Sequence, residues 1–167
     1  MAIATSRPLD KLAAAFAFLL GFATIMGALG SQYFGGLYPC ELCLEQRMAY
    51  YFGLPLLALI LVFWNRLPLP VWYVAMLVVT GIFAWGVYMG SYHAGVEWGF
   101  WPGPTACTGV GESFSFDQLD SMTPVIGCDV VQFRFAGISL AGYNALISLG
   151  IVALLIAAMV FQARRKA

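Results

Sequence analysis

Four long stretches of this chain are almost free of polar side chains, and polar segments separate them. The apolar runs cover residues 12–30, 48–64, 71–90 and 138–161. A helix of about 20 apolar residues is long enough to cross the hydrocarbon core of a bilayer. The pattern therefore predicts an all-α membrane protein, in which four transmembrane helices form one bundle and one domain over residues 1–167.

The polar segments that follow the first and third runs lie on the same side of such a bundle. Residues 31–46 form a short loop that contains the helix breaker Pro39. Residues 91–137 form a long loop that is rich in aromatic rings, which favour the headgroup level of a membrane. We expect the second loop to lie against the membrane surface and to carry a short amphipathic helix at residues 114–122.

Small residues recur at four-residue spacing within the runs. Ala13, Ala17 and Gly21 follow this spacing in the first run, and Gly86 and Gly90 follow it in the third. Small side chains let helix backbones approach closely in lipid. These positions are therefore predicted to face neighbouring helices.

Composition supports a membrane protein and excludes a soluble one. The chain is 62% hydrophobic and only 10% charged, whereas soluble domains carry about 25% charged residues. Its mean hydropathy of +0.85 is too high for a core that must be covered by polar surface. The lipid bilayer is therefore the expected surrounding of the chain. The formal net charge of zero gives no sign of a nucleic-acid partner.

The basic residues predict how the bundle is oriented. Only Arg47 and Arg134 fall on the side of the two cysteine-bearing loops. The six cations on the other side are Arg7, Lys11, Arg66, Arg164, Arg165 and Lys166. Cytoplasmic loops are enriched in Lys and Arg, so both termini are predicted to be cytoplasmic and both loops extracytoplasmic.

A cleavable signal peptide is a competing interpretation of the first run. The sequence at residues 28–30 loosely resembles a cleavage site. The apolar run is longer than the roughly 7–15 residues of a signal peptide's apolar region, which favours a retained helix. Either interpretation places the next loop outside the cytoplasm.

The four cysteines fall in the two loops, where an oxidising compartment allows disulfides to persist. Cys107 and Cys128 could equally form a structural or a redox-active disulfide. Cys40 and Cys43 are separated by two residues, so a bond between them closes a small ring and removes little entropy from the unfolded chain. This spacing is instead typical of dithiol–disulfide exchange, because one thiol can resolve a bond made by the other.

Metal and haem sites are weaker interpretations. A zinc site built from two C-x-x-C pairs would be a strong signal, but Cys107 and Cys128 lie far apart in the sequence. Attachment of a c-type haem is excluded because Leu44, and not histidine, follows Cys43.

Arg47 favours the redox interpretation of the first pair. If a helix begins near Cys43, then Cys43 and Arg47 are i, i+4 neighbours on one face. A helix N-terminus and a nearby cation both favour the thiolate form. The alternative is an interfacial arginine that only extends its head group toward water.

The residues from Pro39 to Arg47, Pro-Cys-x-Leu-Cys-x-x-Gln-Arg, resemble the signature of the DsbB family of disulfide bond formation proteins. The second cysteine pair, the four apolar runs and the stretch from Phe135 to Asn144 are similar to that family too. The resemblance covers nearly the whole chain. It implies a bacterial inner-membrane thiol:disulfide oxidoreductase that works with a periplasmic DsbA-type partner and the membrane quinone pool.

The same resemblance implies a role for each cysteine. A reduced partner would attack a Cys107–Cys128 disulfide, and Cys107 would carry the mixed disulfide. Cys128 would then pass electrons to Cys40. Cys43 would be left facing a quinone, either ubiquinone or menaquinone, and Arg47 would hydrogen-bond a quinone oxygen.

Other polar residues lie on the same side as the cysteine pair or inside an apolar run. His93 is the single histidine and follows the third run on the side of Cys43, so it is either a quinone contact or proton donor or an interfacial residue without a role. Glu97 has a weaker claim to the same role. Glu41 and Glu45 are expected to be solvated charges. The polar group that interrupts the fourth run, the side chain of Asn144, is expected to hydrogen-bond between helices and serve packing.

Two other functions are compatible with the pattern. One is a non-enzymatic four-helix membrane scaffold that is held by two structural disulfides. The other is a related thiol oxidoreductase that serves a different partner or runs toward reduction.

Overall fold

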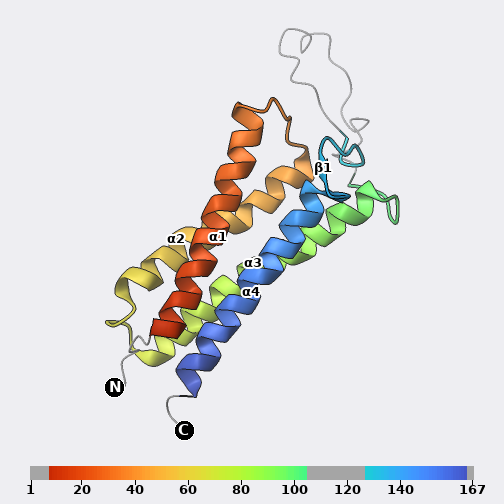
Figure 1. The fold of residues 1–167 in the computed structure, drawn as a ribbon. Helices are drawn as coiled ribbons and strands as arrows, with labels where there is room; N and C mark the ends of the chain where they lie inside the picture. The colour runs from red at the N-terminus through yellow and green to blue at the C-terminus, as the bar shows by residue number, and fades with distance from the viewer. Residues whose placement is uncertain (1–7, 105–126, 165–167) are drawn as a thin grey trace, which may run out of the picture.

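A computed structural model describes residues 8–104 and 127–164 of the chain. The described part is a bundle of long helices with a short β-hairpin at one end (Figure 1). The elements are α1 (Pro8–Tyr33), α2 (Glu41–Phe63), α3 (Leu69–Glu97), β1 (Arg134–Phe135), β2 (Ile138–Ser139) and α4 (Leu140–Ala163). The predicted amphipathic helix at residues 114–122 and Cys107 lie outside the described residues.

All four helices are long and apolar enough to cross a membrane. This result confirms the predicted fold class, an all-α bundle of four transmembrane helices. The described ends of the chain lie together at one end of the bundle, and the hairpin and the loop between α1 and α2 lie at the opposite end (Figure 1). The second end is the one that holds Cys40 and Cys43.

The helices are longer than the apolar runs, and this corrects two expectations. Helix α2 begins at Glu41, not near residue 48, and α3 continues to Glu97, well beyond residue 90. The loop between α1 and α2 is therefore shorter than residues 31–46, and His93 lies in the last turns of α3, not in a loop after it. The reason is that polar side chains mark the edge of the hydrocarbon layer, whereas backbone hydrogen bonding continues past that edge.

Close backbone packing joins α3 to α4. A Cβ atom added at Gly90 would lie 2.8 Å from the backbone nitrogen of Ala145, and one added at Gly86 would lie 3.1 Å from Ser148 Oγ. The prediction that Gly86 and Gly90 face a neighbouring helix is confirmed. Because these contacts bring the two backbones together, they also set the position of Asn144 beside α2 and α3.

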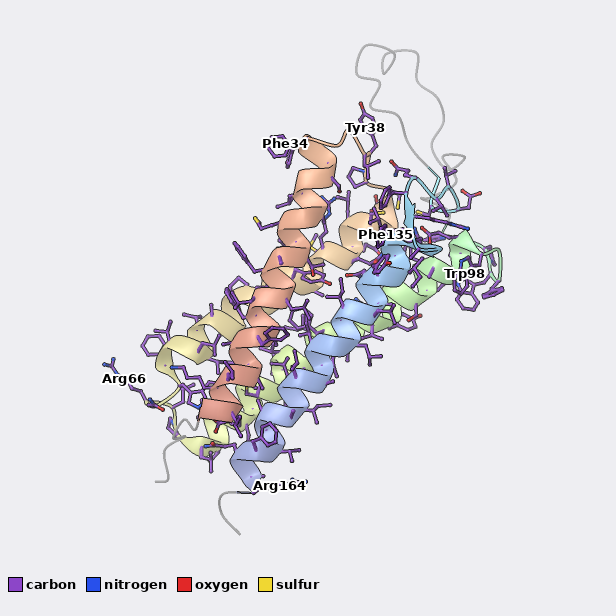
Figure 2. All side chains as sticks on the ribbon, viewed as in Figure 1. Phe34, Tyr38, Arg66, Trp98, Phe135 and Arg164 are labelled. Carbon is purple, nitrogen blue, oxygen red and sulfur yellow. The ribbon has the colours of Figure 1, made fainter. Side chains whose placement is uncertain are left out.

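Large apolar side chains cover much of the outer surface, as expected for lipid-facing helices (Figure 2). At the end near the cysteines several exposed side chains are aromatic, and Phe34, Trp98 and Phe135 are 94%, 55% and 65% exposed. Arg66 and Arg164 lie at the opposite end (Figure 2). These three aromatic rings thus lie at the opposite end from Arg66 and Arg164, whereas Arg47 and Arg134 lie at the cysteine end.

Candidate functional site

Cys40 forms the N-cap of α2. Its backbone is extended, with φ −76° and ψ 173°, and its Sγ accepts a hydrogen bond from the Cys43 backbone N–H at 3.3 Å. An N-cap side chain satisfies one of the free N–H groups that every helix start exposes. Cys40 and Cys43 therefore lie at the two ends of the first turn of α2, and both sulfur atoms lie at the positive end of the helix dipole.

The two sulfur atoms of this pair are in contact. Cys40 and Cys43 are free thiols, and Cys40 S–H donates to Cys43 Sγ over 2.7 Å. This hydrogen bond and the burial of Cys40, which is 5% exposed, raise the pKa of the Cys40 thiol well above its ordinary range. Cys40 therefore keeps its proton, and the donated bond stabilises negative charge on Cys43.

Arg47 reaches across to the last turns of α1. Its guanidinium donates to Gln32 Oε1 at 2.5 Å and to the carbonyl of Ala28 at 3.3 Å. It lies on the same face of α2 as Cys43, on which its positive charge acts. These contacts do not fit an arginine that only extends toward water. The contacts of Arg47 with Gln32 and Ala28 were not predicted from the sequence, in which the polar Gln32 just after the first apolar run was the available signal.

His93 lies between the two cysteine-bearing segments. The side chain is 3% exposed, and its Nε2 atom is 3.7 Å from Cys40 Sγ and 3.1 Å from the backbone carbonyl oxygen of Cys128. A carbonyl oxygen can only accept, so Nε2 carries the hydrogen. Nδ1 then accepts from Gln46 Nε2 at 2.7 Å. The neighbours of the ring thus select one neutral tautomer.

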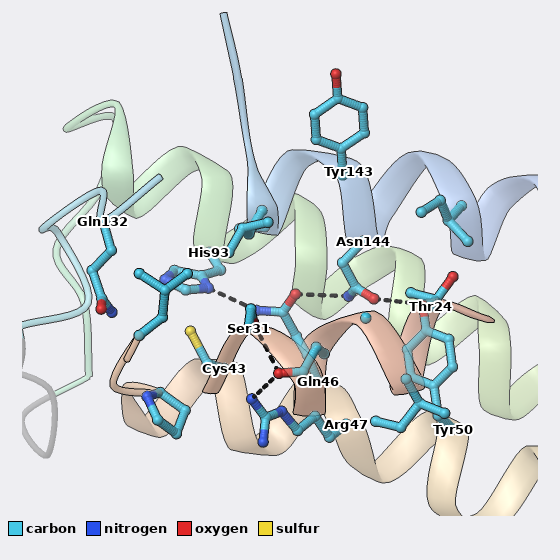
Figure 3. A pocket seen from close by; sticks show the side chains of 18 of the residues that line it. Thr24, Ser31, Cys43, Gln46, Arg47, Tyr50, His93, Gln132, Tyr143 and Asn144 are labelled. Atoms are coloured by element: carbon cyan, nitrogen blue, oxygen red, sulfur yellow. Dashed lines mark hydrogen bonds between the residues drawn. The ribbon is translucent and has the colours of Figure 1, made fainter. Parts of the chain in front are cut away.

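A chain of polar side chains extends from His93 into the bundle (Figure 3). Asn144 Nδ2 donates to Gln46 Oε1 at 2.7 Å, and Tyr50 Oη donates to Asn144 Oδ1 at 2.6 Å. Ser148 Oγ lies 3.3 Å from Tyr50 Oη. The expectation that Asn144 hydrogen-bonds between helices is confirmed. The role of Gln46 was not predicted from the sequence, although a polar residue within a membrane helix is itself a functional signal.

Cys128 belongs to the same buried cluster as Cys40. Its side chain is 1% exposed, and it is disulfide-bonded. Met89 and Val96 of α3 and Leu42 of α2 complete the cluster. The fold therefore packs one residue of the second loop against the C-x-x-C pair. Cys107 lies outside the described residues.

The acidic residues near the site divide into two groups. Glu41 and Glu45 are exposed, as expected for solvated charges. Glu97 is half-buried, and its charge acts on both Cys43 and His93. Its Oε2 atom is buried and has no hydrogen-bond partner among the described residues. Glu97 therefore belongs to the electrostatic environment of the site.

The geometry gives limited support to a metal site. Ligand atoms of Cys40, Cys43 and His93 lie within 4.8 Å of one another. Structural zinc sites use four protein ligands, and in the described part of the chain this group has three. In addition, His93 Nε2 holds the hydrogen that it donates to Cys128, and a nitrogen must lose that hydrogen to bind a metal.

A cavity of about 380 Å³ opens beside the cysteine pair, between α1, α2 and the start of α4 (Figure 3). The side chains of Cys43, Gln46, Arg47, His93 and Asn144 line one part of it. The apolar part of the lining includes Ala23, Ile25, Ala28, Leu140 and Ile147. Its size falls within the roughly 300–1,000 Å³ of small-molecule sites. An apolar ring with oxygen acceptors matches both parts of this lining.

Comparison with known proteins gives a family match. The family model described as Disulfide bond formation protein DsbB matches residues 10–158, which include the whole of the site. No curated protein and no solved structure matches the chain.

Proposed function

This chain belongs to the DsbB family of disulfide bond formation proteins, and from that membership we propose that it is a quinone-dependent protein thiol:disulfide oxidoreductase. It reoxidises a periplasmic DsbA-type partner with a thioredoxin-like fold and passes the electrons to ubiquinone or menaquinone. The observation that carries the proposal is the packing of Cys128 in one buried cluster with Cys40, directly beside the cavity that Cys43 and Arg47 line.

The first half of the reaction passes electrons from the partner's thiols to the Cys40–Cys43 pair by thiol–disulfide exchange. A thiolate of the reduced partner attacks Cys107 of a Cys107–Cys128 disulfide, and Cys128 leaves as a thiolate. When Cys40 and Cys43 are oxidised, Cys128 attacks Cys40, and Cys43 leaves as a thiolate. The burial of Cys128 against Cys40 supports this direction of attack.

The second half returns the chain to its starting state. The partner's other thiolate resolves the mixed disulfide and frees Cys107, which attacks Cys128 and releases Cys40. Cys40 and Cys43 then form their disulfide again, and two electrons and two protons leave the pair. The partner has lost one pair of thiols and gained one disulfide, so the electrons balance.

The lining of the cavity fits a quinone. A bound quinone would supply an acceptor for two electrons and two protons. Cys43 would face the ring, and Arg47 would donate to a ring oxygen and stabilise negative charge there. Gln32 and Ala28 hold the guanidinium in place before any ligand binds.

His93 is proposed as the group that positions Cys40 and stabilises its thiolate. Its Nε2 atom, which carries a hydrogen, lies 3.7 Å from Cys40 Sγ, the sulfur that loses its proton when the pair is oxidised. The bond from Gln46 keeps the second ring nitrogen as an acceptor. The imidazole is therefore held in one orientation while the sulfur changes its state.

The proposed location is the bacterial inner membrane, with both termini cytoplasmic and both cysteine loops periplasmic. The separation of Arg66 and Arg164 from the cysteine end supports this orientation. Thiol labelling of intact cells with a membrane-impermeant reagent tests it, because Cys40 and Cys128 are expected to react from outside only after reduction and unfolding of the site.

The test of function is reoxidation of a reduced thioredoxin-fold partner by purified protein with added quinone. Serine in place of Cys40, Cys43, Cys107 or Cys128 is expected to abolish turnover, while Leu44→Ser, in the same turn, is expected to retain it. A Cys40→Ser variant with quinone should also show a new long-wavelength absorbance band, since Cys43 is then left as a thiolate. Full turnover in any single cysteine variant contradicts the relay, and disulfides inert to mild thiols would indicate a structural scaffold.

A further inference from the structure

Within the described part of the chain, the side chain of Gln132 bonds the segment after Cys128 to the loop before Cys40. The Tyr38 backbone N–H donates to Gln132 Oε1 at 3.0 Å, and Gln132 Nε2 donates to the Tyr38 carbonyl oxygen. The primary amide of Gln132 thus pairs with both polar groups of one backbone residue, as a neighbouring β-strand would. The two residues are 94 positions apart in the chain.

Each residue of this amide pair lies close in sequence to one cysteine. Tyr38 precedes Cys40 by two residues, and Gln132 follows Cys128 by four. A second hydrogen bond, from His93 Nε2 to the Cys128 carbonyl, also holds this segment near the pair. Beyond Gln132, β1 and β2 pair with each other and lead directly into α4. The amide pair is therefore a direct polar contact between the described end of the second loop and the first loop.

We propose that Gln132 is a positioning residue that docks the Cys128 segment on the loop before Cys40 and so sets how readily Cys128 and Cys40 form a disulfide. The use of that disulfide in catalysis rests on the proposed function, but the docking itself does not. Gln132 does not touch the reacting sulfur atoms; it acts through the backbone of Tyr38. Both residues also border the cavity, so an effect on quinone binding must be measured separately.

The direct measurement uses full-length protein with Cys43→Ala and Cys107→Ala, in which Cys40 and Cys128 form the single possible intramolecular disulfide. Its equilibrium with glutathione consumes two protein thiols and one glutathione disulfide, and produces one protein disulfide and two glutathione thiols. The ratio of disulfide to dithiol protein at a known ratio of glutathione to glutathione disulfide gives the effective concentration of Cys128 at Cys40. Gln132→Met keeps the length of the side chain and removes both hydrogen bonds. We expect it to lower the effective concentration about tenfold, which is the size expected for two ordinary hydrogen bonds.

Two further variants control this measurement. Gln132→Glu cannot donate to the Tyr38 carbonyl and is expected to lower the effective concentration in the same direction. Val130→Ala changes a side chain of the same segment that is 56% exposed, and it is expected to leave the value within twofold. An unchanged value in Gln132→Met, or an equal loss in Val130→Ala, overturns the proposal.

Turnover separates docking from quinone binding. In the protein with all four cysteines, Gln132→Met is expected to lower kcat with the thiol partner and to leave KM for quinone unchanged. A raised KM for quinone with an unchanged kcat would make Gln132 a cavity residue and contradict docking. If wild-type protein does not reoxidise the partner but the effective concentration still falls in Gln132→Met, the proposed function fails and the docking contact stands.

Discussion

The Nε2–H of His93 donates to the backbone carbonyl of Cys128 over 3.1 Å, and the same nitrogen is 3.7 Å from Cys40 Sγ. One imidazole of α3 therefore contacts both cysteine-bearing segments at once. This contact is not available to a histidine that lies free at the membrane interface. It makes the protonation and orientation of His93 the central electrostatic feature of the site.

The tautomer of His93 can be read directly, because the chain contains one histidine. In ¹⁵N-histidine-labelled protein, the ring is expected to be neutral and protonated at Nε2. Gln46→Met removes the donor to Nδ1, so a mixture of tautomers is expected. Thr80→Val is the control, since the Thr80 hydroxyl bonds within its own helix, to the Met76 carbonyl. Protonation at Nδ1 in the wild type would contradict the assigned chain of hydrogen bonds.

Replacing Arg47 is expected to weaken the use of quinone and not the reaction with the thiol partner. Histidine at this position cannot reach both Gln32 and Ala28 on α1, and the cation near Cys43 is lost at neutral pH. We expect Arg47→His to raise KM for quinone about tenfold or more. Steady-state kinetics with varied quinone measure this, and Arg66→His, in the turn between α2 and α3, is the matched control. Unchanged quinone kinetics in Arg47→His would remove Arg47 from the binding site.

The reactivity of Cys40 is expected to depend on the sulfur of Cys43. The bond to Cys43 is the largest cause of the raised pKa of Cys40, followed by burial. A raised pKa keeps Cys40 protonated and slow to alkylate at a pH where an ordinary thiol has begun to ionise. In Cys43→Ala the pKa of Cys40 should fall, although burial still raises it, and alkylation near pH 9 should become faster. The measurement is the rate of iodoacetamide labelling against pH in protein that lacks Cys107 and Cys128; a rate unaffected by Cys43→Ala would show that burial alone controls the thiol.

Gly90 is expected to be intolerant of a side chain. A Cβ at this position would lie 2.8 Å from a backbone atom of Ala145 on α4, and backbone cannot move aside as a flexible side chain can. We expect Gly90→Ala to destabilise the bundle by about 1–3 kcal/mol. Gly81→Ala lies on the same helix with nothing within 4 Å, so it should be neutral or slightly stabilising. Unfolding in mixed detergent compares the two, and equal stability would mean that α3 and α4 are less closely packed than described.

Much of the fold follows from local properties of the chain. Bilayer thickness sets a length for an apolar run, so the four runs were enough to predict the four helices. The spacing of Gly86 and Gly90 predicted a packed helix face, because residues four positions apart lie on the same face of a helix. The ends of the helices could not be predicted from the apolar runs. Glu41 and Glu97 are polar residues, but the backbone hydrogen bonding of α2 and α3 extends to them.

The presence of two thiols at the start of α2 was also determined by the sequence. The spacing of Cys40 and Cys43, with Arg47 one helical turn later, is a local pattern, and it predicted a dithiol at the start of a helix. Tertiary structure decided which residues surround it, since each contact joins elements that are distant in the chain. His93 comes from α3, Asn144 from α4, Gln32 from α1 and Cys128 from the segment before the hairpin. Helix periodicity specifies which residues share one face of one helix. Which faces meet depends on the packing of all four helices, and this packing brings the surrounding residues to the cysteine pair.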